Sequence, residues 1–145
     1  MTRLKPNPVP EETRYLNREL SWLQFNDRRL AEAENKANPL LERLKFLAIF
    51  DSNLDEFYMV RVSGLIEQFE SGVLETSPDG LTPNEQLKAI SAAAAPLRKR
   101  AGEVFDKQLH PALGHAGIRI CSYDDLAEKQ RGWLEEFFRR EVFPL

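Results

Sequence analysis

The sequence predicts an all-α fold: an antiparallel bundle of three to four helices, with one short strand-like segment near residues 117–121. Three observations lead to this prediction. Apolar residues recur at helical spacing over long stretches. Helix start signals that include a proline stand at two places along the chain. Only residues 117–121 (GIRIC) alternate in the way that a strand does.

The composition is that of an ordinary folded protein, and it argues against several classes of function. The 145 residues are 42% hydrophobic and 30% charged, and the net charge of −3 gives no electrostatic footprint for nucleic acid. No apolar run approaches the ~20 residues that a membrane span requires. The single cysteine, Cys121, cannot form an internal disulfide, which fits a reducing compartment. We therefore expect a cytoplasmic protein.

Two helices are expected in the first half of the chain. The first covers about 20–35, where leucines recur on one side. Asn38 and Pro39 then supply an N-cap and a proline at the first helical position. The second helix should continue to about residue 70. Residues 51–53 (DSN) are expected to interrupt it, because Asp, Ser and Asn side chains compete for backbone hydrogen bonds.

A third helix is expected to begin at a capping box. Thr82 and Glu85 have the required spacing, with Pro83 between them at the first helical position. The apolar pattern continues to about Leu109. Pro96 lies inside it and should kink the helix or end a segment.

The last part of the chain is expected to hold the strand-like segment and one more helix. His110-Pro111 should close the third helix, and Ser122 should cap a last helix over about 124–142. The sequence ends on the apolar letters EVFPL, and a lone strand has no partner to pair with. We expect from both that the natural protein continues beyond this sequence; a complete domain with an apolar end is the alternative.

The second helix is apolar on two faces. A surface helix needs one apolar face to pack on its own core. We therefore expect the second face to be covered by more protein, a partner or a flat ligand. At about 100° per residue, the first stripe holds Leu44, Leu47, Asp51, Leu54, Tyr58, Leu65 and Phe69, and the second holds Phe46, Ile49, Asn53, Phe57 and Val60.

A search for catalytic patterns is negative. The sequence has no GxxxxGK[ST] loop and no GxGxxG. One cysteine and two histidines cannot form a zinc set. Neither His110 nor His115 has a carboxylate at triad-like spacing, and the basic runs are interpreted as solvated helix faces. We predict no catalytic residue and no metal ligand in this chain.

Phe46 and Asn53 are the candidate binding residues. They are seven residues apart and so lie two turns along one side of a helix. An aromatic ring offers stacking area, and an amide offers the donor and the acceptor that an adenine edge requires. On spacing alone, a structural role is the alternative, with Phe46 in the core and Asn53 as a cap or a satisfied buried amide.

Three motifs resemble bacterial polyphosphate kinase of the long type. They are ELSWLQFN (19–26), NPLLER (38–43) and SNLDEF (52–57), and the similar stretch covers about 50 residues without a departure inside the motifs. The end of the chain, QRGWLEEFFRREVFPL, resembles the opening of the next domain of that family, the head domain. Residues 1–12 hold three prolines and no apolar period and are expected to be a flexible arm. The resemblance implies the helical N-terminal domain over 13–116 and a truncated head domain over 117–145.

The resemblance also implies a function. Such enzymes transfer the terminal phosphate of ATP to inorganic polyphosphate, and the residues at Asn53 and Phe46 would help to hold the ATP base. The catalytic residues would lie in domains outside this chain. The partners of this chain would be ATP or ADP, inorganic polyphosphate and those other domains. Magnesium with ATP and a homo-oligomer are implied; peripheral membrane association of the whole enzyme stays open. The alternative is a helical protein-interaction module whose second apolar face binds a partner helix.

Overall fold

The computed structural model describes residues 15–145, which divide into two compact units. The first unit extends to Leu109, and the second is His110–Leu145. The predicted arm over 1–12 lies outside the described residues. No described residue is in a strand, and helices make up most of both units, so the all-α prediction is confirmed.

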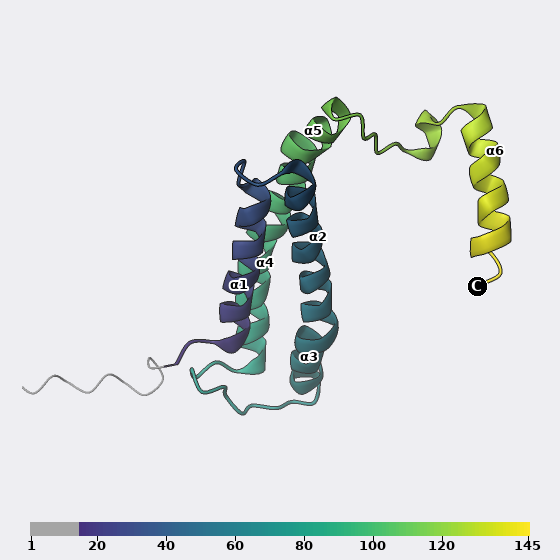
Figure 1. Ribbon diagram of the computed structural model, residues 1–145. Helices are drawn as coiled ribbons and strands as arrows, with labels where there is room; N and C mark the ends of the chain where they lie inside the picture. Colours follow the sequence, from purple (N-terminus) through teal and green to yellow (C-terminus); the bar gives the residue numbers. More distant parts are fainter. Residues whose placement is uncertain (1–14) are drawn as a thin grey trace, which may run out of the picture. The chain divides into compact units, whose positions relative to one another are not determined.

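Three helical rods form the first unit (Figure 1). Residues 35–39 join the first rod to the second, and residues 71–82 join the second to the third. The rods therefore run up, down and up, with α1 packed against both α2 and α4. The first rod is α1 (Arg18–Glu34); the second is α2 (Leu40–Glu56), the π-helical η2 (Phe57–Val62) and α3 (Ser63–Glu70); the third is α4 (Pro83–Val104) with the π-helical η3 (Phe105–Leu109).

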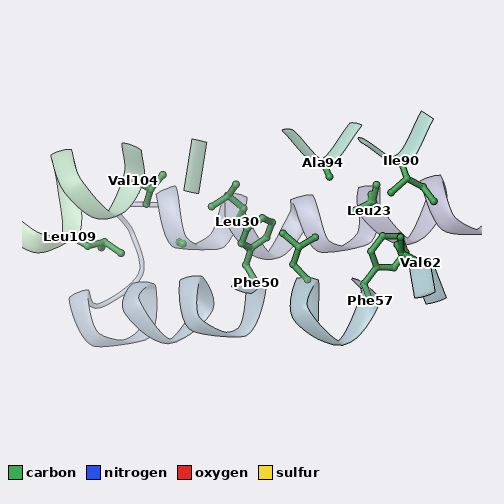
Figure 2. Close-up of a cluster of buried hydrophobic side chains, with 11 residues drawn as sticks. Leu23, Leu30, Phe50, Phe57, Val62, Ile90, Ala94, Val104 and Leu109 are labelled. Atoms are coloured by element: carbon green, nitrogen blue, oxygen red, sulfur yellow. The ribbon is translucent and has the colours of Figure 1, made fainter. Parts of the chain in front are cut away.

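The core lies where the three rods meet. Figure 2 shows Leu30 of α1 pointing toward Phe50 of α2, and both side chains are completely buried. Phe50 belongs to neither predicted stripe of the second helix. It lies between the two stripes around the helix axis, at the point where α2 faces both neighbours. The other members of this buried cluster are Leu23, Ala33, Leu54, Phe57, Val62, Ile90, Ala94, Val104 and Leu109.

The predicted interruption at 51–53 is wrong. α2 is regular through Glu56, because Asp51 and Ser52 are exposed to water and Asn53 bonds to another helix instead of to its own backbone. The irregular turns come later, in η2. Residues five apart in an α-helix are separated by about 140° around the axis, whereas a π-turn brings them nearly into line. Phe57 and Val62, at that spacing, are both buried in the core.

Among the local predictions for the first unit's helices, one is confirmed and one is wrong. The Thr82–Glu85 capping box is present with Pro83 at the start of α4. α4 does not end at Pro96, which lies on its exposed side, where water can satisfy the carbonyl group that loses its partner; the kink expected as the alternative stays a prediction. Asn38 does not cap α2; its amide instead donates to the backbone and the carboxylate of Glu32.

The second unit holds short helical segments. They are α5 (His110–His115), the 3₁₀ turn η4 (Tyr123–Asp125), α6 (Glu128–Phe137) and the π-helical η5 (Phe138–Val142). His110-Pro111 does not close the third helix as expected, because residues 110–115 are still helical. Residues 117–121 form no strand, because the described residues offer none to pair with. Ser122 caps η4, not the last helix, which begins after Ala127.

Among the helices of residues 15–145, none is both long enough and apolar enough to cross a lipid bilayer.

Candidate functional site

Asn53 lies at the interface between α2 and α1. Its Nδ2 donates to Oδ1 of Asn26 at 3.0 Å, and Asn26 Nδ2 in turn donates to the backbone carbonyl of Phe50 at 2.9 Å. Asn26 is completely buried, whereas Asn53 is half-buried. The oxygen Oδ1 of Asn53 accepts no hydrogen bond from the described residues, and it is not among their buried polar atoms left without a partner. It is therefore open to solvent or to a ligand.

A hollow of about 260 Å³ lies beside Asn53. Helix α1 contributes aromatic rings to it, α2 contributes the amide and a carboxylate, and η2 contributes apolar surface and a guanidinium. Such a mixture of ring faces and a few polar groups is typical of sites for planar organic ligands. The lining residues are Trp22, Phe25, Asn53, Glu56, Phe57, Val60 and Arg61.

The inner wall of the hollow is a fixed stack of side chains. The rings of Trp22 and Phe57 are nearly parallel, with centroids 4.6 Å apart. The guanidinium of Arg61 lies 5.9 Å from the Trp22 ring centroid, and its Nη1 is 3.3 Å from Oε2 of the buried Glu19. Aromatic stacking and a cation over a ring face each stabilise this arrangement. The wall is therefore held in place before any ligand arrives.

Two further guanidinium groups lie near Phe25, one of the lining residues. Those of Arg28 and Arg29 are 5.6 Å and 5.0 Å from the ring centroid of Phe25. Phe25 itself is 38% exposed. These cations do not line the hollow, but they add positive charge beside one of its rings, and positive charge attracts anionic groups.

Phe46 lies on α2, two turns before Asn53, but it does not line this hollow. It is half-buried and packs against the core cluster. The structure thus brings Asn53 together with Trp22 and Phe25 of α1. The joint role of Phe46 and Asn53 around one ligand stays a prediction.

The two apolar stripes of the second helix face two neighbouring helices. Asn53 and Phe57 meet Asn26 and Trp22 of α1. On the other side, a hollow of about 460 Å³ is bordered by the first stripe and by α4 and η3, through Leu44, Leu47, Ala48, Asp51, Arg98, Ala101, Gly102 and Phe105. The second face is therefore covered by more protein at Phe57, where α1 buries it, whereas Val60 of the same stripe stays 65% exposed.

Asp51 needs no buried partner. Its side chain is exposed, and the nearby cation Arg61 pairs with Glu19.

No metal site stands out in residues 15–145. No three His, Cys, Asp or Glu side chains converge there in a way that would hold an ion.

The fold and the hollow define an all-α domain with a pre-formed aromatic site that carries an oriented amide. A family model described as the polyphosphate kinase N-terminal domain matches residues 15–121. The chain belongs to this family.

Relatives support the same assignment. Over 139 residues the chain is 52% identical to a polyphosphate kinase of Mycolicibacterium gilvum, covering 96% of this chain and 19% of that protein. Over 132 residues it is 54% identical to a polyphosphate kinase of Mycobacterium tuberculosis, covering 91% and 18%. The crystal structure of the polyphosphate kinase from Porphyromonas gingivalis matches with a TM-score of 0.64 and 34% identity, over 88% of this chain and 18% of that one. The chain thus spans less than a fifth of the length of these relatives.

Sequence reasoning found Asn53 but assigned no binding role to its neighbours Trp22, Phe25 and Asn26. The available signal was the motif 19–26. On a helix, its positions 22 and 26 lie one above the other, so a tryptophan and an asparagine there face the same neighbouring rod.

Proposed function

We propose that this chain is the base-positioning domain of a polyphosphate kinase that transfers the terminal phosphate of ATP to inorganic polyphosphate. The observation that carries the proposal is the half-buried amide of Asn53, whose Nδ2 is held by Asn26 while its Oδ1 stays open beside an aromatic hollow. A purine base can stack on ring faces and hydrogen-bond to that amide at the same time.

Positioning of this kind contributes directly to phosphoryl transfer. The reaction depends mostly on alignment and on charge stabilisation, with little covalent work for the protein. Holding the base fixes one end of ATP, and the guanidinium groups of Arg28 and Arg29 supply positive charge close to Phe25, which lines the hollow. Magnesium, bound with ATP, supplies charge neutralisation at the phosphates, and its protein ligands belong to other domains of the enzyme.

The proposal includes the surroundings of the chain. ATP or ADP and inorganic polyphosphate are the small-molecule partners, and the remaining domains of the same enzyme supply the catalytic residues. We also propose a homo-oligomer, as the resemblance of the three motifs implies, and a cytoplasmic location, which the single cysteine favours.

The test is the substitution Asn53→Ala in the polyphosphate kinase of which we propose this chain to be a part. Losing one or two hydrogen bonds to a bound base should cost about 1–3 kcal/mol. The KM for ATP should then rise roughly 5- to 150-fold, with little change in the melting temperature. Steady-state kinetics and thermal unfolding are measured on the same variant.

Asn84→Ala is the matched control, because it makes the same chemical change at another half-buried asparagine, in α4. It should leave the KM unchanged. An unchanged KM for Asn53→Ala beside a large loss of stability would assign Asn53, and Phe46 with it, to the scaffold.

The isolated chain is expected to be inactive. The sequence offers neither a phosphate-binding loop nor a histidine in a catalytic setting. Purified protein of residues 1–145 should form no polyphosphate from ATP and magnesium, measured by incorporation of labelled phosphate. If polyphosphate is still formed after traces of full-length enzyme have been removed, the proposal that the catalytic residues lie in the other domains is contradicted.

A further inference from the structure

Asn26 is the one completely buried asparagine of the described residues, whereas the other buried polar side chains all keep some exposed surface. Burying an amide costs free energy unless its polar atoms find partners. Asn26 has both partners on α2: the carbonyl of Phe50 accepts from its Nδ2, and Nδ2 of Asn53 donates to its Oδ1. A leucine would fill the same space without needing hydrogen-bond partners, so packing alone does not explain why position 26 holds an amide.

The chemistry of the partners fixes the direction of each hydrogen bond. A backbone carbonyl can only accept, so Asn26 must turn its Nδ2 toward Phe50. Its Oδ1 then faces Asn53 and can only accept, so Asn53 must use its own Nδ2 there. Oδ1 of Asn53 is consequently the atom left open, together with the second N–H of its Nδ2. A single buried carbonyl thus decides which way round Asn53 presents its amide.

We propose that Asn26 is a positioning residue that orients Asn53 so that its Oδ1 accepts a hydrogen bond from the 6-amino group of adenine. This inference rests on the proposed function of the site. The remaining N–H of Asn53 can donate to an adjacent ring nitrogen. A base with a 6-oxo group, such as hypoxanthine or guanine, would set its oxygen against Oδ1, so the same orientation disfavours it. Asn26 therefore contributes to base selectivity without touching the base.

The first experiment compares nucleotides on the unmodified enzyme. Purine riboside triphosphate lacks the 6-amino group, and its KM should exceed that of ATP by about 3- to 10-fold, the loss of one hydrogen bond. Inosine triphosphate, with a 6-oxo group, should be worse than purine riboside triphosphate. Asn53→Ala should bring all three KM values together. Equal values in the unmodified enzyme would overturn the assignment of Oδ1 to the amino group.

The second experiment removes the orienting amide. In Asn26→Leu the amide of Asn53 is free to turn over, so the preference for ATP over inosine triphosphate should fall several-fold, with kcat for ATP changed little. If Asn26→Leu does not fold, Asn26→Ala gives the same test, because it removes the amide without placing a larger side chain in the core. Leu30→Ala is the control, since it destabilises the same helix at a completely buried position whose side chain has no hydrogen-bonding group, and it should keep the preference.

The outcomes separate this inference from the proposed function. An unchanged KM for ATP in Asn53→Ala rejects the base site itself. A raised KM in Asn53→Ala, with the ATP preference intact in Asn26→Leu, keeps the site and overturns the role of Asn26. A preference lost equally in Leu30→Ala also overturns it, because general loosening of α1 would then explain the result.

Discussion

Arg43 shows how a single charged residue joins the ends of two rods. It is only 8% exposed, yet no carboxylate among the described residues pairs with it. Its Nε donates to the carbonyl of Ala33 at 2.8 Å, and its Nη2 donates to Oε1 of Gln108 at 2.9 Å. Ala33 lies in the last turn of α1, where carbonyls lack helical partners and the helix end attracts positive charge. Arg43 therefore serves as a cap for α1 supplied by α2.

Replacing Arg43 should destabilise the first unit. Arg43→Met keeps the apolar stem and removes both hydrogen bonds, and the free energy of unfolding should fall by about 1.5–3 kcal/mol, the range for hydrogen bonds to charged groups. Urea unfolding followed by circular dichroism measures the change. Arg98→Met is the matched control at an exposed position of α4 and should change stability little. Equal losses in the two variants would show that Arg43 does not cap α1.

At the scale of the helix, the capping box of α4 couples stability to pH. Thr82 Oγ1 donates to Oε2 of Glu85 at 2.7 Å, and the Thr82 backbone N–H donates to the same oxygen at 2.9 Å. The side-chain bond first, and the backbone bond second, lower the pKa of Glu85 below its ordinary value of 4.5. Because the folded pKa is the lower one, this contribution is complete above pH 4.5 and is lost as the pH falls through the folded value.

The variant Glu85→Gln should therefore flatten the acid side of the stability profile. Glutamine can keep the capping box but does not titrate in this range. Between pH 6 and 3, the unmodified chain should lose more of its unfolding free energy than the variant does, as followed by urea unfolding at each pH. Glu75→Gln, in the loop 71–82, controls for the removal of one carboxylate. Parallel profiles for Glu85→Gln and the unmodified chain would disprove the coupling.

The helices themselves were largely predictable, since local chemistry determines them. The box at Thr82 and Glu85 depends on a spacing of three residues, and the structure contains it. The predictions failed where a side chain forms its hydrogen bond with a residue of a helix to which it does not itself belong. Residues 51–53 were expected to break α2, but Asn26 of another helix takes up the amide of Asn53. Asn38 was expected as a cap, but its amide reaches Glu32. Phe50 was missed because a three-rod bundle buries the zone between two stripes.

The candidate site divides in the same way. The amide at position 53 was predictable from helical spacing beside an aromatic and from the motif 52–57. The ring stack of Trp22 and Phe57 was not, because it depends on the register between α1 and η2. The π-helical segment η2 shifts that register, and none of the residue types in its sequence, FYMVRV, predicts a π-helix.

At the scale of the whole molecule, the second unit exposes a large amount of apolar surface. Trp133 is 64% exposed and Phe143 is 77% exposed, and α6 and η5 expose Phe137, Phe138 and Val142 as well. Patches of this kind on a protein in water usually mark a contact surface. We expect the chain to self-associate through them as its concentration rises.

Sedimentation velocity over a concentration series tests this expectation. The average mass should increase with concentration, and the double substitution Trp133→Ser and Phe143→Ser should reduce the increase. Met59→Ser in η2, at a residue 71% exposed in the first unit, is the control and should not. A constant monomer mass at high concentration would contradict the prediction.

The up-and-down order of the three rods also affects how fast the first unit forms. Each rod packs against the rods next to it in sequence, joined by residues 35–39 and 71–82, so most contacts close short loops. Chains with such local contacts fold in microseconds to milliseconds, whereas synthesis adds only about 5–20 residues per second. Helices α1 to α4 would thus be assembled almost as soon as they leave the ribosome, and the ring stack of Trp22 and Phe57 would be in place before the later segments of the chain are made.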